Sequence, residues 1–288
     1  MSPPLAALID RELRQTVQPG ARVIAELLRT RHGEAVRAIL FYGSCLRTRD
    51  AAGVLDFYVL VDDYRAFHRA VMPALFNRLL PPNVYFLRTE GAPSVAAKVA
   101  VISLRQFAAR MRVQSLDTTL WARFTQPSAL LYAADETARA AVIGAIEEAQ
   151  RTAIAWARRF APGAATPRAL WTALFENTYG AELRAETAQR AAHLYETEPA
   201  RYDAIAAGLG DLRAASGAWG LRRAAGKSLS VLRLIKAAFT FAGAADYVAF
   251  KIERHTGVPL ALTPWQRRHP VLAAPALLAR LYREGLIR

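Results

Sequence analysis

A glycine–serine pair and a strand aspartate are the residues of this sequence best suited to chemistry. An apolar run, 38–42, ends at Gly43 and Ser44, and a second apolar run, 54–61, carries one acid, Asp56. Glycine lets the backbone approach a phosphate closely, serine and neighbouring amides bond phosphate oxygens, and a carboxylate can hold a divalent metal ion. The spacing therefore predicts a site for a nucleoside triphosphate and its metal.

These features follow the pattern of the nucleotidyltransferase superfamily, in which Gly-Ser precedes a strand with Asp-x-Asp or Asp-x-Glu. Here the second acid is absent, because Tyr58 occupies its position. A helix-like segment, 21–31, precedes the first strand, where the superfamily places a helix. An acid inside an apolar strand also costs free energy to bury unless a cation or hydrogen bonds compensate it. These points favour a site, while an ordinary turn with an edge charge stays open as the alternative.

The chain is strongly basic and long enough for one large domain or two of ordinary size. It has 288 residues, with 38 lysines and arginines against 24 acids, for a net charge of +14. This surplus predicts anionic partners: nucleic acid, an anionic membrane surface or phosphorylated substrates. Lysine is rare, and Lys98 is the only one in the first 226 residues.

A single cysteine, Cys45, excludes an intramolecular disulfide and a cysteine-based zinc site. Because no histidine lies in the same motif, we expect a small residue fitted into a tight turn rather than a nucleophile. The first five residues lack the basic-then-apolar order of a secretory signal. No stretch reaches about 18 consecutive apolar residues, so we expect no spanning helix.

The elements that would position the motif form a small α/β layer up to about residue 135. We predict strands at 38–42, 54–61, 84–87 and 96–103, a further apolar segment at 129–132, and helices at 70–80, 104–112 and 116–123. Beyond residue 136 the pattern becomes alanine-rich and helical. We predict helices there at 136–160, 167–179, 181–195, 201–209, 221–241, 244–256 and 274–286. The sequence thus predicts an α/β domain, 1–136, and a mainly helical domain, 137–288, packed on it.

Seven blocks, in their order and spacing over about residues 38 to 252, resemble a known family. They are Tyr42-Gly43-Ser44-Cys45, Leu55-Asp56-Phe57, Val61-Asp62-Asp63, Asn83-Val84-Tyr85-Phe86, the strand Lys98 to Ser103, Tyr179-Gly180-Ala181-Glu182-Leu183-Arg184, and the segment Lys227 to Thr240. The family is that of the soluble mitochondrial-type phosphatidate cytidylyltransferases, also called the translocator assembly and maintenance proteins. Cys45 replaces a family glycine, and Ala181-Glu182 replaces a Gly-Asp pair.

The resemblance implies transfer of a cytidylyl group from CTP to phosphatidate, giving CDP-diacylglycerol and pyrophosphate with Mg²⁺. It also implies a nucleotidyltransferase-like mixed sheet followed by a mostly helical, winged-helix-like part. In that family a lone aspartate followed by phenylalanine is the normal form of the strand. Tyr58 therefore does not argue against activity.

The resemblance and the residue types together assign roles to ten positions. We expect Asp56 and Lys98 to be catalytic, Tyr42, Gly43, Ser44 and Arg184 to bind the nucleotide, Lys227, Arg233 and Lys236 to bind the lipid phosphate, and Asp56 and Glu182 to hold the metal. A solvated charge is the alternative for each lysine, arginine and glutamate of this set.

The lipid would be reached from an anionic membrane surface. The segment 237–250 is apolar and aromatic with basic flanks, which suits an interfacial helix or a buried core helix. The cluster 265–269 is a second candidate contact. We expect a bacterial cytoplasmic protein, peripheral at the inner membrane; the sequence predicts neither the oligomeric state nor the acyl preference.

Two other functions stay open. A nucleotidyltransferase acting on RNA or on protein would share the fold, and the net charge suits RNA, although no RNA-recognition motif is present and we expect no stable nucleic-acid partner. A catalytically inactive nucleotide-binding module would explain the missing second acid. Metal-dependent CTP binding without turnover would identify the inactive module.

Overall fold

The computed structural model describes residues 4–50, 53–89, 94–181, 188–240, 243–256, 260 and 262–268. Its first half contains α1 (Leu5–Leu13), α2 (Pro19–His32), a 3₁₀ turn (Gly33–Ala35), β1 (Val36–Tyr42), α3 (Ser44–Thr48), β2 (Leu55–Val61), α4 (Tyr64–His68), α5 (Val71–Leu79), β3 (Asn83–Arg88), β4 (Ala96–Ser103), α6 (Leu104–Met111), α7 (Thr118–Arg123) and β5 (Ser128–Ala133). Helices follow: α8 (Glu136–Phe160), α9 (Pro167–Tyr179), α10 (Ala188–Thr197), α11 (Pro199–Gly208), α12 (Trp219–Thr240), α13 (Ala244–Thr256) and α14 (Pro264–Arg268).

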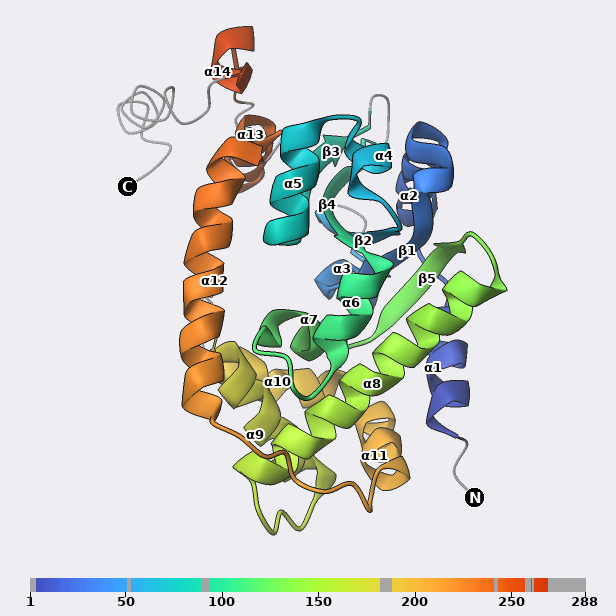
Figure 1. Cartoon of the computed structure of the whole chain (residues 1–288), viewed down its shortest axis with the longest axis vertical. Coiled ribbons are helices and arrows are strands. Elements are labelled where there is room, and N and C mark those ends of the chain that lie inside the picture. Colours follow the sequence, from blue (N-terminus) through green and yellow to red (C-terminus); the bar gives the residue numbers. More distant parts are fainter. Residues whose placement is uncertain are drawn as a thin grey trace.

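The strands form one mixed sheet in the order β3-β4-β2-β1-β5 (Figure 1). Only β2 and β4 pair in parallel, and the other neighbours are antiparallel. The four predicted strands are confirmed, and the apolar segment 129–132 is the fifth. The predicted α/β layer followed by a helical part is therefore confirmed as an architecture.

The central strands read as continuous apolar runs because the sheet is covered on both faces. On one face, Ile39, Phe41 and Val59 pack with residues of α2. On the other, Leu40 and Tyr58 join a larger cluster with residues of α6, α7 and α8. Alternation along each strand thus decides which side chains point toward the helical part.

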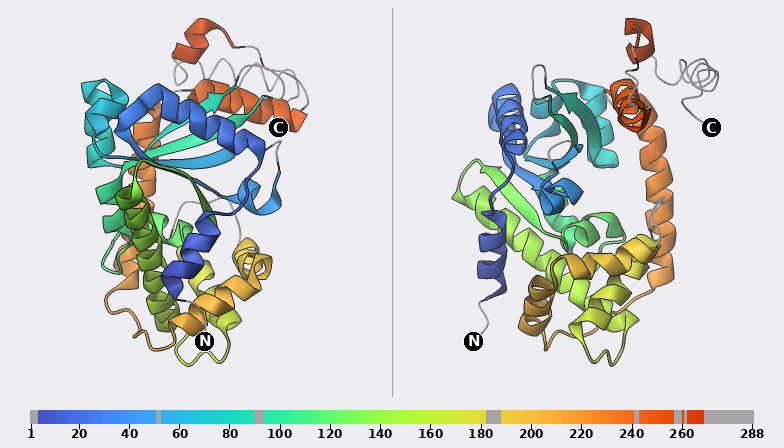
Figure 2. Two further views of the ribbon diagram at one scale, coloured as in Figure 1. Left: turned by 90° about the vertical axis from the view of Figure 1, so that its right-hand side faces the viewer. Right: turned by 180° about the vertical axis from the view of Figure 1, so that it is seen from behind.

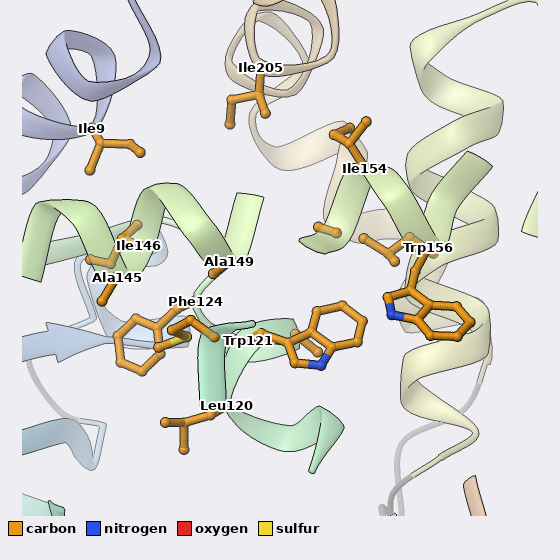
Figure 3. Close-up of a cluster of buried hydrophobic side chains, with 14 of the residues drawn as sticks. Ile9, Leu120, Trp121, Phe124, Ala145, Ile146, Ala149, Ile154, Trp156 and Ile205 are labelled. Atoms are coloured by element: carbon orange, nitrogen blue, oxygen red, sulfur yellow. The ribbon is translucent and has the colours of Figure 1, made fainter. Parts of the chain in front are cut away.

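The helical part contributes most of the larger apolar cluster (Figure 3). α8 begins where Asp135 accepts a hydrogen bond from the Ala138 amide, and its alanines let other elements approach closely. Trp156 of α8 and Trp121 of α7 are fully buried. Since this cluster runs from the sheet into the helices, the two parts pack together, and their division into two domains at residue 136 stays a prediction.

The long helix α12 runs beside the rest of the molecule, from the helical part to the edge of the sheet (Figures 1 and 2). Near its start, Arg222 stacks over Trp156, 4.7 Å from the ring centre, and donates to the Val113 carbonyl. Toward its end, Lys236 donates to the Pro82 carbonyl at 2.7 Å. α12 therefore ties the two parts together at both of its ends.

The apolar segment 237–250 is not one helix, because Gly243 separates α12 from α13. Gly243 has φ +82°, and a β-carbon there would lie 2.8 Å from the Phe86 carbonyl oxygen, so only glycine fits. On α13, Tyr247 and Phe250 pack against Phe86 at ring-centre distances of 5.4 and 5.9 Å. These two half-buried aromatics thus cover the sheet edge, and the choice between an interfacial and a core helix stays open.

The remaining predicted helices have mixed outcomes. Five of them correspond to α8, α9, α11, α12 and α13, whereas 274–286 lies outside the described residues. Of the predicted helix 181–195, the described part is α10, which begins at Ala188. The helices α1 and α14 were not predicted. No helix within the described ranges is both long and apolar enough to cross a membrane.

Candidate functional site

Three of the predicted site residues meet at one end of the sheet. In the strand register, Tyr42 of β1 lies opposite Asp56 of β2, and Asp56 lies beside Lys98 of β4. Alternation places these positions on the same face as Tyr58 and Leu40, toward α6, α7 and α8. The three strand positions and the turn after β1 therefore lie together, and their role as a site stays a prediction.

Position 43 requires glycine because its backbone lies against the side chain of Asp56. Its backbone has φ 91° and ψ −166°, and a β-carbon there would lie 2.9 Å from Asp56 Oδ2. An L-residue would suffer both the strained backbone and this collision. Ser44 follows as the exposed first residue of the short helix α3. The turn thus packs the Gly43 backbone against the Asp56 carboxylate, with Ser44 next in the chain.

Asp56 is half-buried and lies among cations. Burial raises the pKa of its carboxyl group, and the charges of Lys98, Arg123 and Arg47 oppose that rise. Desolvation is the larger effect, so the carboxylate is held at a cost in free energy. A group that is destabilised in this way, in a strongly basic setting, is typical of a binding or catalytic site.

Arg123, at the end of α7, is a site residue that the sequence did not single out. Its Nη1 donates to the Tyr58 hydroxyl at 3.2 Å, and its guanidinium lies 5.7 Å from the Tyr42 ring centre. Tyr58 itself is fully buried, with its ring against Phe107 and Phe124. The position expected to hold a second acid therefore orients an arginine toward the site.

Arg47 is the second site residue that the sequence reasoning missed. It lies on α3, and its Nη1 donates to Gln126 Oε1 at 2.8 Å. The signal that could have found it is its place three residues after Ser44, within the motif itself. Arg123 offered a weaker signal, since it was only the last residue of a predicted helix.

Cys45 is a buried residue of the turn, as expected. Its Sγ donates to the Val54 carbonyl at 3.3 Å. A β-carbon at Gly53 would lie only 2.4 Å from the same sulfur, so glycine covers the thiol closely. The contact joins the two ends of the segment between β1 and β2.

Two predicted site residues, Glu182 and Arg184, lie outside the described residues. The segment before them is placed: Ala181 is fully buried, and a β-carbon at Gly226 of α12 would lie 2.7 Å from its carbonyl oxygen. Across the described ranges, no three histidine, cysteine, aspartate or glutamate side chains gather into a metal site. The metal-binding roles of Asp56 and Glu182 therefore stay predictions.

The predicted lipid-phosphate residues lie on α12, away from the strand ends that hold Asp56. Arg233 donates to both carboxylate oxygens of Asp117 and, at 2.9 Å, to the Pro81 carbonyl. Lys227 is exposed.

The side chain of Lys236, on α12, contacts the start of β3. Its Nζ contacts Asn83 Oδ1 at 2.9 Å as well as the carbonyls of Leu80 and Pro82. Burial, and then the charge of Arg233, lower the pKa of Lys236 to about 8. Since Asn83 pairs with Val101, this contact lies three positions along β4 from Lys98. Lys236 and Arg233 therefore hold α12 in place.

The fold and this site define an α/β protein with a half-buried carboxylate among cations at one end of its sheet. No protein-family model and no curated protein matches the chain. A function for it therefore has to be argued from the geometry and chemistry of the site.

Proposed function

We propose that the protein is a nucleotidyltransferase that transfers a cytidylyl group from CTP to phosphatidate, forming CDP-diacylglycerol and pyrophosphate. The observation that carries this proposal is the Asp56 carboxylate, which is packed against Gly43 and influenced by the charges of Lys98, Arg123 and Arg47. A triphosphate would add negative charge to this basic setting. The sequence blocks supply the choice of CTP and phosphatidate.

The reaction suits a site that offers charge and alignment rather than a strong base. An oxygen of the phosphatidate monoester attacks the α-phosphorus of CTP, the bond to the bridging oxygen of the β-phosphate breaks, and pyrophosphate leaves. The monoester is already anionic at neutral pH, so no proton has to be removed. Lys98 and Arg123 would bind the triphosphate oxygens on which charge accumulates.

Magnesium fits this site if it enters together with the nucleotide. Mg²⁺ in proteins is commonly held by one or two carboxylates plus substrate phosphates, and Asp56 provides one carboxylate. When bound, the ion would neutralise charge on the leaving pyrophosphate. Three cations near Asp56 repel a free divalent ion, so we expect tight metal binding only with CTP present. Glu182 is the proposed second ligand.

The finer fold assignments belong to this proposal as well. The antiparallel β1–β2 pair with a short helix after Gly43 supports a nucleotidyltransferase-like sheet. The winged-helix-like character of the helical part rests on the sequence blocks alone. Tyr42, Ser44 and Arg184 are proposed to complete the nucleotide site. Lys227 is proposed to contact the lipid phosphate with Arg233 and Lys236, which would first have to leave their contacts at the end of α5.

The same proposal places the protein at the cytoplasmic side of a bacterial inner membrane, as a peripheral protein. The acceptor is a lipid, and a net charge of +14 suits an anionic bilayer. Nucleic acid is proposed not to be a stable partner.

The test is a transfer assay with CTP labelled on its α-phosphate, Mg²⁺ and phosphatidate in detergent micelles. We expect labelled CDP-diacylglycerol from the wild type and none above background from Asp56→Ala. The matched control is Asp62→Asn, which removes an exposed acid just beyond the other end of β2 that pairs with Arg37 at 3.2 Å. The proposal fails if no product forms while Asp56→Ala leaves Mg-CTP binding unchanged.

The high positive charge also favours a second candidate, a nucleotidyltransferase acting on RNA ends. The same labelled CTP, offered with RNA in place of phosphatidate, distinguishes the two. Label in the RNA but not in lipid would replace the first proposal with the second. Mg-CTP binding with neither product would identify an inactive nucleotide-binding module.

A further inference from the structure

On α5 the usual arrangement of a surface helix is reversed: a polar side chain is buried and the large apolar side chains are exposed. Its buried positions are Ala74 and Asn77, and the Asn77 amide donates to the Val101 carbonyl at 2.9 Å. Its large apolar side chains instead face solvent, with exposed fractions from 37% to 70%. They are Val71, Met72, Leu75, Phe76 and Leu79. A surface helix normally turns such residues toward the core.

The helix α12 shows the same reversal on a larger scale. Its inward side is basic: Arg222 and Lys236 are buried, and Arg233 binds Asp117. Its exposed apolar residues have exposed fractions from 45% to 75%. They are Leu221, Val231, Leu232, Leu234 and Ile235. The polar contacts described above hold the helix in this orientation, so its apolar side is presented outward.

These two helices form one region of the surface. Of the fourteen large apolar side chains that are exposed among the described residues, ten lie on α5 and α12. The helices meet where Lys236 of α12 binds the carbonyls of Leu80 and Pro82, directly after α5. Apolar residues scattered singly need no explanation, but a concentration of this kind marks an interaction site.

The charges of the region indicate an anionic partner. Neither α5 nor α12 contains an acidic residue, whereas each carries basic ones. A pocket of about 480 Å³ adjoins Val71 and Leu75 of α5 and is lined by three exposed arginines, Arg65, Arg78 and Arg105. None of these three forms an ion pair within the described ranges. The pocket thus offers unneutralised positive charge next to the exposed apolar side chains.

The acids of the same pocket do not cancel this charge. The Asp62 carboxylate pairs with Arg37, and the Asp63 carboxylate accepts from the Ala66 amide at the start of α4. Both are therefore already engaged.

We propose that the outward surface of α5 and α12 is where the protein lies on an anionic phospholipid bilayer. The apolar side chains enter the interface between headgroups and acyl chains, and the arginines of the pocket bind headgroup phosphates. The inference rests on the proposed function in one respect, that a lipid acceptor gives the protein a reason to reach a membrane. A second copy of the chain fits less well, because two such surfaces would bring basic helices against each other.

The test is flotation of the purified full chain with vesicles. One set consists of phosphatidylcholine, and the other of equal parts phosphatidylcholine and phosphatidylglycerol, so that no substrate is present. We expect binding to the anionic vesicles and much weaker binding to the neutral ones. Leu234→Glu with Ile235→Glu should lower the partition to anionic vesicles at least about tenfold. Arg65→Gln and Arg105→Gln should each lower it about fivefold.

The matched control is Val23→Glu with Leu27→Glu, which places the same charges on two exposed apolar positions of α2. It should bind vesicles as the wild type does, and circular dichroism checks that every variant is folded. The proposal is overturned if the wild type does not float, or if the α12 variant floats equally well. A wild-type dimer that the α12 variant dissociates in sedimentation, with vesicle binding unchanged, would make a second copy the occupant instead.

A transfer assay in detergent micelles separates this inference from the proposed function. If the α12 variant keeps its activity in micelles but loses vesicle binding, both stand. Vesicle binding by a wild type that makes no CDP-diacylglycerol would overturn the function alone. Activity in micelles without vesicle binding would overturn the docking surface alone.

Discussion

Two aspartates of this protein, the half-buried Asp56 and the buried Asp117, have opposite electrostatic outcomes. Asp117 begins α7, where its carboxylate accepts from the Thr119 amide at 3.2 Å and binds Arg233 and Arg110. Burial acts to raise its pKa, but the arginines and hydrogen bonds hold the pKa below its ordinary value. For Asp56, burial outweighs three neighbouring cations, and the pKa is raised.

The difference teaches how to separate a structural carboxylate from a functional one. Asp117 has its partners in direct contact and joins α6, α7 and α12, so its charge is used within the fold. At Asp56 the cations act through their charge, and no hydrogen bond contributes to its pKa. A carboxylate in such a setting is a candidate for ligand binding.

The largest expected effect is the loss of activity in Asp56→Asn. Removing the single strand carboxylate should lower cytidylyl transfer by about 10³-fold, because the metal and the leaving group lose their fixed anchor. Its stability in urea should equal or exceed that of the wild type, since a costly buried charge disappears. Initial rates measure the expected loss of activity, and urea unfolding measures the stability. A stable variant with normal rates would remove Asp56 from the chemistry.

Asp117→Asn should lower stability and leave activity nearly unchanged. It leaves Arg233 and Arg110 without their carboxylate, and removing one partner of a buried pair costs about 3 kcal/mol of the free energy of unfolding. Activity per folded molecule should stay near that of the wild type at low temperature. Urea titrations measure the loss, with Asp135→Asn, at the exposed start of α8, as the milder control. A stable but inactive Asp117→Asn would erase the distinction between the two aspartates.

The next effect concerns the arginine that faces Asp56. Arg123→Gln should raise the KM for CTP by about tenfold or more, because one cation that balances the triphosphate is lost. Tyr58→Phe removes only the hydroxyl that accepts from Arg123 and should raise the same KM by a smaller factor, roughly three- to tenfold. Steady-state kinetics over a range of CTP concentrations test both. Equal effects on kcat and none on KM would argue against nucleotide binding.

The smallest effect is a contrast in pH dependence. The folded pKa of Asp56 is raised above 3.8, so the folded state holds that proton more tightly and stability is lost as pH rises through this window. The folded pKa of Asp117 is lowered, so its contribution is present above 3.8 and is lost as pH falls through the folded pKa.

Urea unfolding of the wild type and of the two asparagine variants between about pH 3 and pH 7 measures this contrast. Relative to the wild type, Asp56→Asn should gain stability as the pH rises, and Asp117→Asn should lose it. Parallel curves for the two variants would contradict the assignment of the two environments.

The sequence predicted the strands that bring some of the candidate site residues together. Gly43 directly follows β1 and Asp56 lies on the neighbouring strand β2, so the apolar runs that predicted the strands also brought the two residues together. Lys98 required only the further prediction of β4. Arg123 could not be found in this way, because its contact with Tyr58 spans 65 residues and depends on how α7 packs.

The reversed helices were beyond prediction for a different reason. The period of polar and apolar residues shows that α12 has two different sides, but not which side faces the protein. Because charged residues of a surface helix usually face solvent, the basic residues of α12 were expected to contact solvent or ligand. In the structure, Arg233 binds Asp117, and Lys236 binds the carbonyls after α5. These partners lie more than a hundred residues away in the chain and came together only with the tertiary structure.

Because Gly53 packs over Cys45, the rate at which this thiol reacts depends on local opening of the structure. The thiol is buried and shielded, and no second cysteine competes with it for a reagent. Alkylation or disulfide exchange can therefore proceed only when the turn between β1 and β2 opens. The rate at which a disulfide reagent consumes this thiol in the unlabelled native protein reports that opening directly. Slowing of the reaction by Mg-CTP would show how far a ligand at Asp56 closes the turn beside it.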